Sequence, residues 1–281
     1  MIRRSAKRRE VAKRAKAIRS GRSEMPVLVY QMGKVGSSTI SFSMRTAGIE
    51  CEHVHRVLPE TIKAVRKQHL QRGVEPKDER VGLAIGRRLR ESNEPVRIIT
   101  MVREPISRNI SAYFQNLSEF FVGEELNSIR VDGAIETFLE EYPHQTPVKW
   151  FDDEFETATG LSVYRGGFDF EKGYEIFTEG KYSVLCLRVE EPDETKQIAL
   201  EEFLGRKDII LTSANVANQK AYADLYREFK NQVVLPEEYI DNLLQSKYAT
   251  YFYSGKELER IREGWSKNRR QPVMEYIARC E

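Results

Sequence analysis

The sequence predicts an α/β protein in which helices cover both faces of a mostly parallel sheet. Three observations support this prediction: short apolar runs typical of buried strands, polar helical segments between them, and Gly or Pro where several of these segments meet. Strands joined by helices form parallel pairs with right-handed crossovers. With 281 residues, 40% of them hydrophobic, the chain is long enough for such a domain and its core.

Three apolar runs predict buried strands, at 27–30, 96–102 and 182–189, and alternating residues predict a further short strand at 52–57. The helices expected around them are 37–47, 59–92 with a break at 73–76, one that begins at Pro105, and, after Pro192, 197–204, 222–229 and 258–265. Gly48 suits the end of the first helix, and Pro105 suits the first turn of a later one. Residues 23–281 are therefore expected to form a single three-layer α/β/α domain. Residues 118–170, aromatic and acidic, are predicted to be an inserted helical subregion.

The N-terminal arm, residues 1–22, differs in charge from the rest of the chain. It holds ten Lys and Arg and one Glu, a net charge of +9, which leaves −7 on the remainder of a chain whose total is +2. Val11, Ala15 and Ile18 recur in it at helical spacing. This pattern favours either a solvated helix or a helix that contacts an anionic membrane surface or polymer; no specific nucleic acid is expected as a partner.

The location expected from the sequence is cytoplasmic, peripheral to a membrane if the arm binds one. No apolar run approaches the roughly 18 to 20 residues of a membrane-spanning helix, and the charged start does not resemble a secretory signal. Cys51, Cys186 and Cys280 are few and widely spaced, which indicates free thiols in a reducing compartment.

A glycine-bearing turn follows the first expected strand and precedes the first helix after the arm. It runs from Gly33 to Thr39 with the sequence GKVGSST. Such a turn binds anions, because glycines let backbone amides approach the ligand and the helix N-terminus adds positive potential. A Walker A motif places lysine after the second glycine, whereas here Lys34 precedes it. We therefore expect a phosphate-linked anion bound without a metal ion; the alternative is that the glycines only shape the turn.

A second candidate anion site follows the strand 96–102. Arg103 stands at the end of the strand, where a Walker B protein would have a metal-binding Asp, and Ser111 lies eight residues later in the next helix. A guanidinium binds phosphate oxygens bidentately, so Arg103 and Ser111 together suit one phosphate. The alternative is a capped helix with surface arginines.

The two motifs, in this order, resemble the 5′-phosphosulfate loop and the 3′-phosphate site of sulfotransferases that use 3′-phosphoadenosine-5′-phosphosulfate (PAPS). More closely, the loop, the segment Lys149-Trp150-Phe151-Asp152 and the tail 246–254 resemble the capsular-polysaccharide-synthesis branch of that superfamily. The late Arg-Lys-Gly motif of cytosolic small-molecule sulfotransferases is missing. The chain is therefore not expected to be a close relative of those enzymes.

The resemblance implies a P-loop-like fold, PAPS as co-substrate without a metal ion, and roles for particular residues. Lys34 would contact the bridging oxygen and the sulfuryl group, and Arg103 and Ser111 would hold the 3′-phosphate. The residues implied around the 5′-phosphate are Gly33, Lys34, Val35, Gly36, Ser37, Ser38 and Thr39.

Sulfuryl transfer to an alcohol also needs a base that takes the hydroxyl proton. His53 and His55 lie on the second expected strand, where alternation points both to one face. His55 is nearer the carboxyl end of the strand, where ligands of parallel sheets bind, and it resembles the catalytic histidine of heparan-type 2-O-sulfotransferases. His53 and a carboxylate, Glu60 or Glu104, stay open as alternatives.

The expected function is transfer of a sulfuryl group from PAPS to a hydroxyl of a carbohydrate or related acceptor by in-line displacement. One alternative is an ATP- or GTP-dependent kinase of P-loop type. The other is a non-catalytic module that binds an anionic polymer or membrane through the arm. Residues 118–170 are expected on the acceptor side, and Arg188 is predicted either to form an ion pair or to line the acceptor cleft.

Overall fold

The computed structural model describes residues 2–22, 24–212 and 221–266 and divides the chain into two compact units. Unit 1 comprises residues 1–103 and 149–215, and unit 2 comprises residues 104–148 and 216–281. The segment 118–170, predicted as one insertion, contributes to both units. The single domain over 23–281 stays a prediction.

Unit 1 is built on a five-stranded sheet, so the predicted α/β class with a mostly parallel sheet is confirmed. The strands are β1 (Val27–Tyr30), β2 (Cys51–Val54), β3 (Val96–Val102), β4 (Tyr174–Glu179) and β5 (Tyr182–Arg188), in the order β2-β1-β3-β5-β4. All neighbours are parallel except β4, which runs antiparallel to β5. β4 is an additional strand that the sequence analysis did not predict, and β2 ends at Val54 instead of residue 57.

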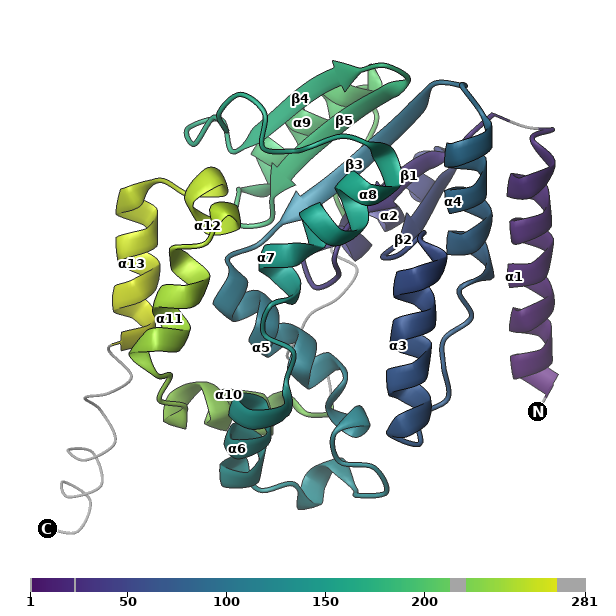
Figure 1. Cartoon of the computed structure of the whole chain (residues 1–281). Coiled ribbons are helices and arrows are strands. Elements are labelled where there is room, and N and C mark those ends of the chain that lie inside the picture. The colour runs from purple at the N-terminus through teal and green to yellow at the C-terminus, as the bar shows by residue number, and fades with distance from the viewer. Residues whose placement is uncertain (1, 23, 213–220, 267–281) are drawn as a thin grey trace, which may run out of the picture. The chain divides into compact units, whose positions relative to one another are not determined.

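Helices cover both faces of this sheet. In Figure 1, α8 lies in front of the strands, and α2 and α9 lie behind them. The helical elements in unit 1 are α1 (Ile2–Ser20), α2 (Ser37–Thr46), α3 (Pro59–Gln71), α4 (Arg80–Glu91), the π-helix Phe151–Glu156, α8 (Thr157–Thr159) and α9 (Asp193–Leu204). The helix α7 (Thr146–Trp150) carries the chain from unit 2 into unit 1.

The basic arm forms α1, which packs along α4. Ile18 is only 6% exposed, and its carbonyl accepts a hydrogen bond from Arg88 Nη1 at 3.2 Å. Arg14 forms an ion pair with Glu52 on β2. These contacts make α1 a packed part of unit 1 and not a freely solvated helix.

Unit 2 is helical among its described residues. Its helices are α5 (Pro105–Gln115), α6 (Val131–Glu141), α10 (Ala223–Gln232), α11 (Glu237–Leu244), α12 (Lys247–Phe252) and α13 (Gly255–Ser266), with 3₁₀ turns at Leu117–Glu119 and Leu126–Ser128. Buried aromatic side chains from three helices meet in its core, where the Tyr113 and Phe138 rings are 5.3 Å apart and those of Phe114 and Phe229 are 5.0 Å apart. Across the described parts of both units, we find no helix that is long and apolar enough to span a membrane.

Candidate functional site

The loop between β1 and α2 has an unusual backbone. Gly33, Lys34 and Gly36 have φ angles of 88°, 65° and 77°, and Lys34 is the single non-glycine residue with positive φ among the described residues. A left-handed conformation costs a residue with a Cβ about 1–2 kcal/mol. Such strain persists where the surroundings enforce it, and it is frequent at ligand-binding sites.

Close approaches on both sides hold this loop in place. A Cβ on Gly36 would lie 2.4 Å from Val189 Cγ2, just after β5, and one on Gly33 would lie 3.7 Å from the His55 ring. Gly36 is also the N-cap of α2, where it offers no side chain to the first amides of the helix. The loop and the helix N-terminus therefore present backbone N–H groups of the kind that bind phosphate oxygens.

A buried polar network lies under the loop and centres on Gln31. The Gln31 Oε1 accepts the amide of Gly33, and Gln31 Nε2 lies 2.6 Å from Ser37 Oγ and 2.8 Å from His53 Nε2. Ser37 Oγ and His53 Nε2 are 2.9 Å apart. Because Gln31 Nε2 can only donate, His53 Nε2 is an acceptor and the His53 ring is neutral. The Ser37 hydroxyl is already engaged by this network.

His55 follows the last residue of β2, and one hydrogen bond fixes its tautomer. His55 Nδ1 lies 2.9 Å from the Gln31 carbonyl oxygen, which can only accept, so Nδ1 carries the proton. The 3.1 Å approach of Gln31 Nε2 to the same nitrogen is then a contact between two donors. Nε2 keeps its lone pair, which is what a general base requires, and the side chain is exposed at the surface.

The protein around them lowers the pKa of both histidines. Desolvation, followed by the charge of Arg45, lowers the pKa of His53 to about 4. Desolvation and then the neighbouring His53 lower the pKa of His55, and contact of this side chain with solvent limits the shift. Both rings are consequently neutral at pH 7, and their centroids are 4.9 Å apart.

The cations predicted for the site meet at this loop in part. Arg103 Nη1, at the end of β3, donates to the Lys34 carbonyl oxygen at 3.2 Å, and the pairing of β3 with β1 brings the two residues together. Both residues are half-buried. Val35 is fully buried, so only its backbone can contact a ligand, whereas Ser38 is exposed and Thr39 half-buried at the start of α2.

A buried carboxylate, which the sequence analysis did not single out, holds the segment that follows His55. Glu154 is 2% exposed and lies in the π-helix Phe151–Glu156. It accepts hydrogen bonds from the Tyr30 hydroxyl at 2.8 Å, from the amides of Val57 and Leu58 at 2.6 and 3.2 Å, and from the Thr61 hydroxyl at 2.5 Å.

Trp150, one turn earlier in the chain, also contacts this segment. Its indole N–H donates to the His55 carbonyl oxygen at 3.1 Å. Trp150 and Glu154 thus fix the position of residues 55–61 through hydrogen bonds. No sequence motif indicates this, because Glu154 and its partners are 93 to 124 residues apart in the sequence.

Comparison with protein families gives a match that covers this supporting segment. The family described as "Putative capsular polysaccharide synthesis protein" matches residues 135–254. Over these residues the chain is similar to that family. Comparison with curated proteins gives no match, and comparison with solved structures gives none. The match supports the capsular-polysaccharide-synthesis family expected from the sequence over 120 residues, which include Trp150 and Glu154, while the sulfotransferase superfamily stays a prediction.

Other predicted site residues have different positions. Ser111 is half-buried on α5 in unit 2, and its part in the site stays a prediction. The Glu104 carboxylate accepts hydrogen bonds from the amides of Ile106 and Ser107 and so caps α5, while Glu60 is exposed in the first turn of α3. Capping accounts for the Glu104 carboxylate without a catalytic role.

Arg188 and the cysteines have structural positions. The buried Arg188 forms an ion pair with Glu191 at 2.5 Å and donates to the Phe170 carbonyl oxygen at 2.8 Å, so the ion-pair alternative is confirmed. Cys51 and Cys186 are buried free thiols, and burial raises the pKa of each. Cys280 lies outside the described residues. Within the described ranges, three or more His, Cys, Asp or Glu side chains nowhere gather as a metal site.

Proposed function

We propose that this protein is a PAPS-dependent sulfotransferase that transfers a sulfuryl group to a hydroxyl of a carbohydrate acceptor. The observation that carries the proposal is the meeting, within unit 1, of the left-handed loop at Lys34, the end of β3 at Arg103 and the neutral His55. The description of the matching family supports a carbohydrate acceptor. A P-loop-like fold, a cytoplasmic location and binding without a metal ion belong to the same proposal.

The fit of the loop to a phosphosulfate rests on its backbone. Positive φ angles at Gly33, Lys34 and Gly36 turn the chain tightly just before α2, and Gly36 gives the first amides of α2 no side-chain cap, which favours an anion at that helix N-terminus. Lys34 and Arg103 add positive charge beside them. PAPS, when bound there, would supply an activated sulfuryl group with a bisphosphate as leaving group.

His55 is the proposed base. Its Nε2 accepts the proton of the acceptor hydroxyl as that oxygen forms a bond to sulfur and the bond from sulfur to the phosphate oxygen breaks. The electron pair of the broken bond stays on the 3′,5′-bisphosphate, and Lys34 stabilises the charge that builds there. The Gln31 carbonyl holds the Nδ1–H tautomer throughout.

Calorimetry tests the cofactor assignment. We expect 3′,5′-bisphosphoadenosine to bind more tightly than ATP and to bind equally well with and without Mg²⁺. A preference for ATP, or a requirement for Mg²⁺, would instead identify the kinase alternative.

Three substitutions test the residue roles. Arg103→Ala should weaken binding of the bisphosphate, and Lys34→Ala should impair transfer. His55→Ala should leave bisphosphate binding intact and remove transfer of radiolabelled sulfate from PAPS, because only the base is lost. Full turnover by His55→Ala would exclude His55 as the base.

A further inference from the structure

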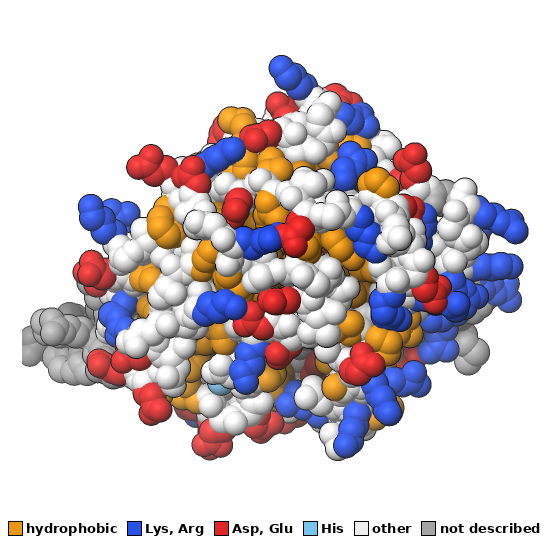
Figure 2. Space-filling view, turned by 45° about the horizontal axis from the view of Figure 1, so that its top comes forward, with side chains coloured by type: hydrophobic (Ala, Val, Ile, Leu, Met, Phe, Trp, Pro, Cys, Tyr) orange, Lys and Arg blue, Asp and Glu red, His pale blue; other side chains and the backbone are white. Residues whose placement is uncertain are grey.

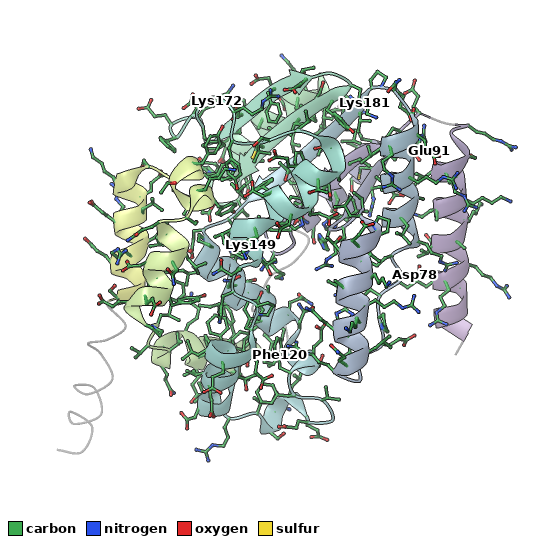
Figure 3. All side chains as sticks on the ribbon, in the orientation of Figure 1. Asp78, Glu91, Phe120, Lys149, Lys172 and Lys181 are labelled. Atoms are coloured by element: carbon green, nitrogen blue, oxygen red, sulfur yellow. The ribbon has the colours of Figure 1, made fainter. Side chains whose placement is uncertain are left out.

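A groove runs along the junction of α1 and α4 in unit 1. Its largest part, of about 880 Å³, lies between α1, α3 and residues 75–80. That part shares Arg80 and Leu83 with a second part, which in turn shares Arg19 and Arg87 with a third. We call these three connected parts the basic groove. Asp78 and Glu91, labelled in Figure 3, line its two end parts.

The lining of the basic groove has a surplus of positive charge. Nine Lys and Arg line it against five Asp and Glu. Four of the carboxylates are occupied by ion pairs: Arg8–Glu75, Arg80–Asp78, Arg87–Glu91 and Arg88–Glu94. The cations that form no ion pair with a described carboxylate are Lys7, Lys16, Arg19, Arg66 and Lys77. Figure 2 shows Lys and Arg side chains gathered on the right, the side where α1 lies.

The packing of α1 argues against a bilayer as the occupant. Amphipathic helices bind membranes by burying an apolar face among the lipids. Here Ile18 is buried and Val11 lines the basic groove, so the apolar residues of α1 face the protein. Its exposed side carries Arg9 and Lys13 instead.

The lining also argues against nucleic acid. None of the described residues that line the three parts is aromatic, so they offer no platform on which bases could stack. A linear chain of acidic sugars needs only spaced cations and an elongated groove. The rest of the chain, with a net charge of −7, would repel such a polymer, and α1 supplies four of the lining cations.

The basic groove and the candidate site share a stretch of the chain. Lys77 lines the largest part of the groove, and its positive charge is one of the smaller causes of the lowered pKa of His55. Arg66 lines the same part from α3, which begins four residues after His55. The proposed base and part of the groove lining are thus carried by one segment of the chain, residues 55–66.

We propose that the basic groove binds the acceptor of the proposed transfer and that this acceptor is a linear acidic polysaccharide. That the bound polymer is the acceptor depends on the proposed function. That the polymer binds depends on the groove alone.

Binding of a fluorescently labelled polygalacturonate to the full-length protein, without nucleotide, tests the inference by anisotropy. Unlabelled dextran serves as the neutral competitor, and we expect it not to displace the labelled polymer. Raising the salt concentration should weaken binding. Lys16→Gln/Arg19→Gln should weaken it about tenfold or more, because both side chains line the groove and neither forms an ion pair with a described carboxylate.

The matched control is Arg9→Gln/Lys13→Gln, which removes the same charge from two residues of the same helix that are not among the lining residues of the groove. We expect it to change the affinity by less than about threefold. Equal losses in the two double variants, or no binding of the polymer, would overturn the inference. Binding to phosphatidylserine vesicles that depends on Arg9 and Lys13 would also overturn it and identify a membrane as the partner.

The nucleotide experiment separates the two proposals. If the polymer binds with the expected variant pattern and 3′,5′-bisphosphoadenosine does not bind, the proposed function fails and the polymer site stands. If the bisphosphate binds and the polymer does not, the acceptor inference fails alone.

Discussion

At the scale of single residues, Lys34 combines backbone strain with a proposed chemical role. Its φ of 65° is a conformation that glycine adopts without cost. Lys34→Gly should therefore be more stable than Lys34→Ala by about 1 kcal/mol, since both lose the amine but only alanine retains the strain. Urea denaturation of the two variants measures this difference. Alanine equal to or more stable than glycine would show that the loop is relaxed in solution.

His53 links the site to the pH dependence of stability. Above pH 6.5 it is neutral in the folded and unfolded states, so it adds no pH dependence. As the pH falls from about 6.5 to about 4, the unfolded chain binds a proton that the folded protein does not, and the free energy of unfolding decreases. The loss should be roughly 2–3 kcal/mol for this group by pH 4.

His53→Gln removes this titration while keeping a side chain that can accept from Gln31. Urea midpoints measured at pH 7.5, 6 and 4.5 should fall less steeply for the variant than for the wild type. Parallel curves for the two proteins would mean that His53 is protonated in the folded state at an ordinary pKa.

At the scale of elements, the π-helix Phe151–Glu156 stabilises the segment that follows His55. Glu154→Ala would leave buried donors on Tyr30, Val57 and Leu58 without an acceptor and should cost about 3 kcal/mol. Glu154→Gln keeps one carbonyl oxygen for these donors, and its amide can donate to the Thr61 hydroxyl, so about 1 kcal/mol is expected. Chemical denaturation gives both values; equal effects would contradict the shared-acceptor geometry.

The elements predicted from the sequence are those whose signals are local. The strands 27–30 and 96–102 agree with the structure because each is an apolar run buried almost throughout. β4 was missed because it is an edge strand whose Glu175, Thr178 and Glu179 interrupt the apolar pattern. α1 was predicted as a helix, but its packing against α4 depends on contacts such as Arg88 to Ile18, 70 residues apart.

In the candidate site, too, local features could be predicted and long-range contacts could not. Gly33, Lys34 and Arg103 could be proposed for the site because a glycine turn after a strand and a cation at a strand end are visible in the sequence. The tautomer of His55 could not be predicted, since it depends on a carbonyl oxygen 24 residues away. The role of Glu154 could not be predicted either, because its hydrogen-bond partners are far from it in the sequence.

At the scale of the whole molecule, the family match does not follow the compact units. Residues 135–254 contain β4 and β5 but lack the central strands β1 and β3 and the edge strand β2. Expressed alone, this fragment should not fold, because two strands of one sheet leave most of the apolar surface of β5 uncovered. Circular dichroism and amide NMR of the fragment measure this; a dispersed spectrum would contradict it.

The division of the chain has a consequence for its inheritance. The backbone passes between the two units at residues 103–104, 148–149 and 215–216, so neither unit is encoded by one uninterrupted stretch. A single recombination event within the gene cannot transfer either unit intact to another protein. The two units are therefore expected to be inherited together. A chimaera that exchanges one of them must be joined at all three positions where the backbone passes between the units.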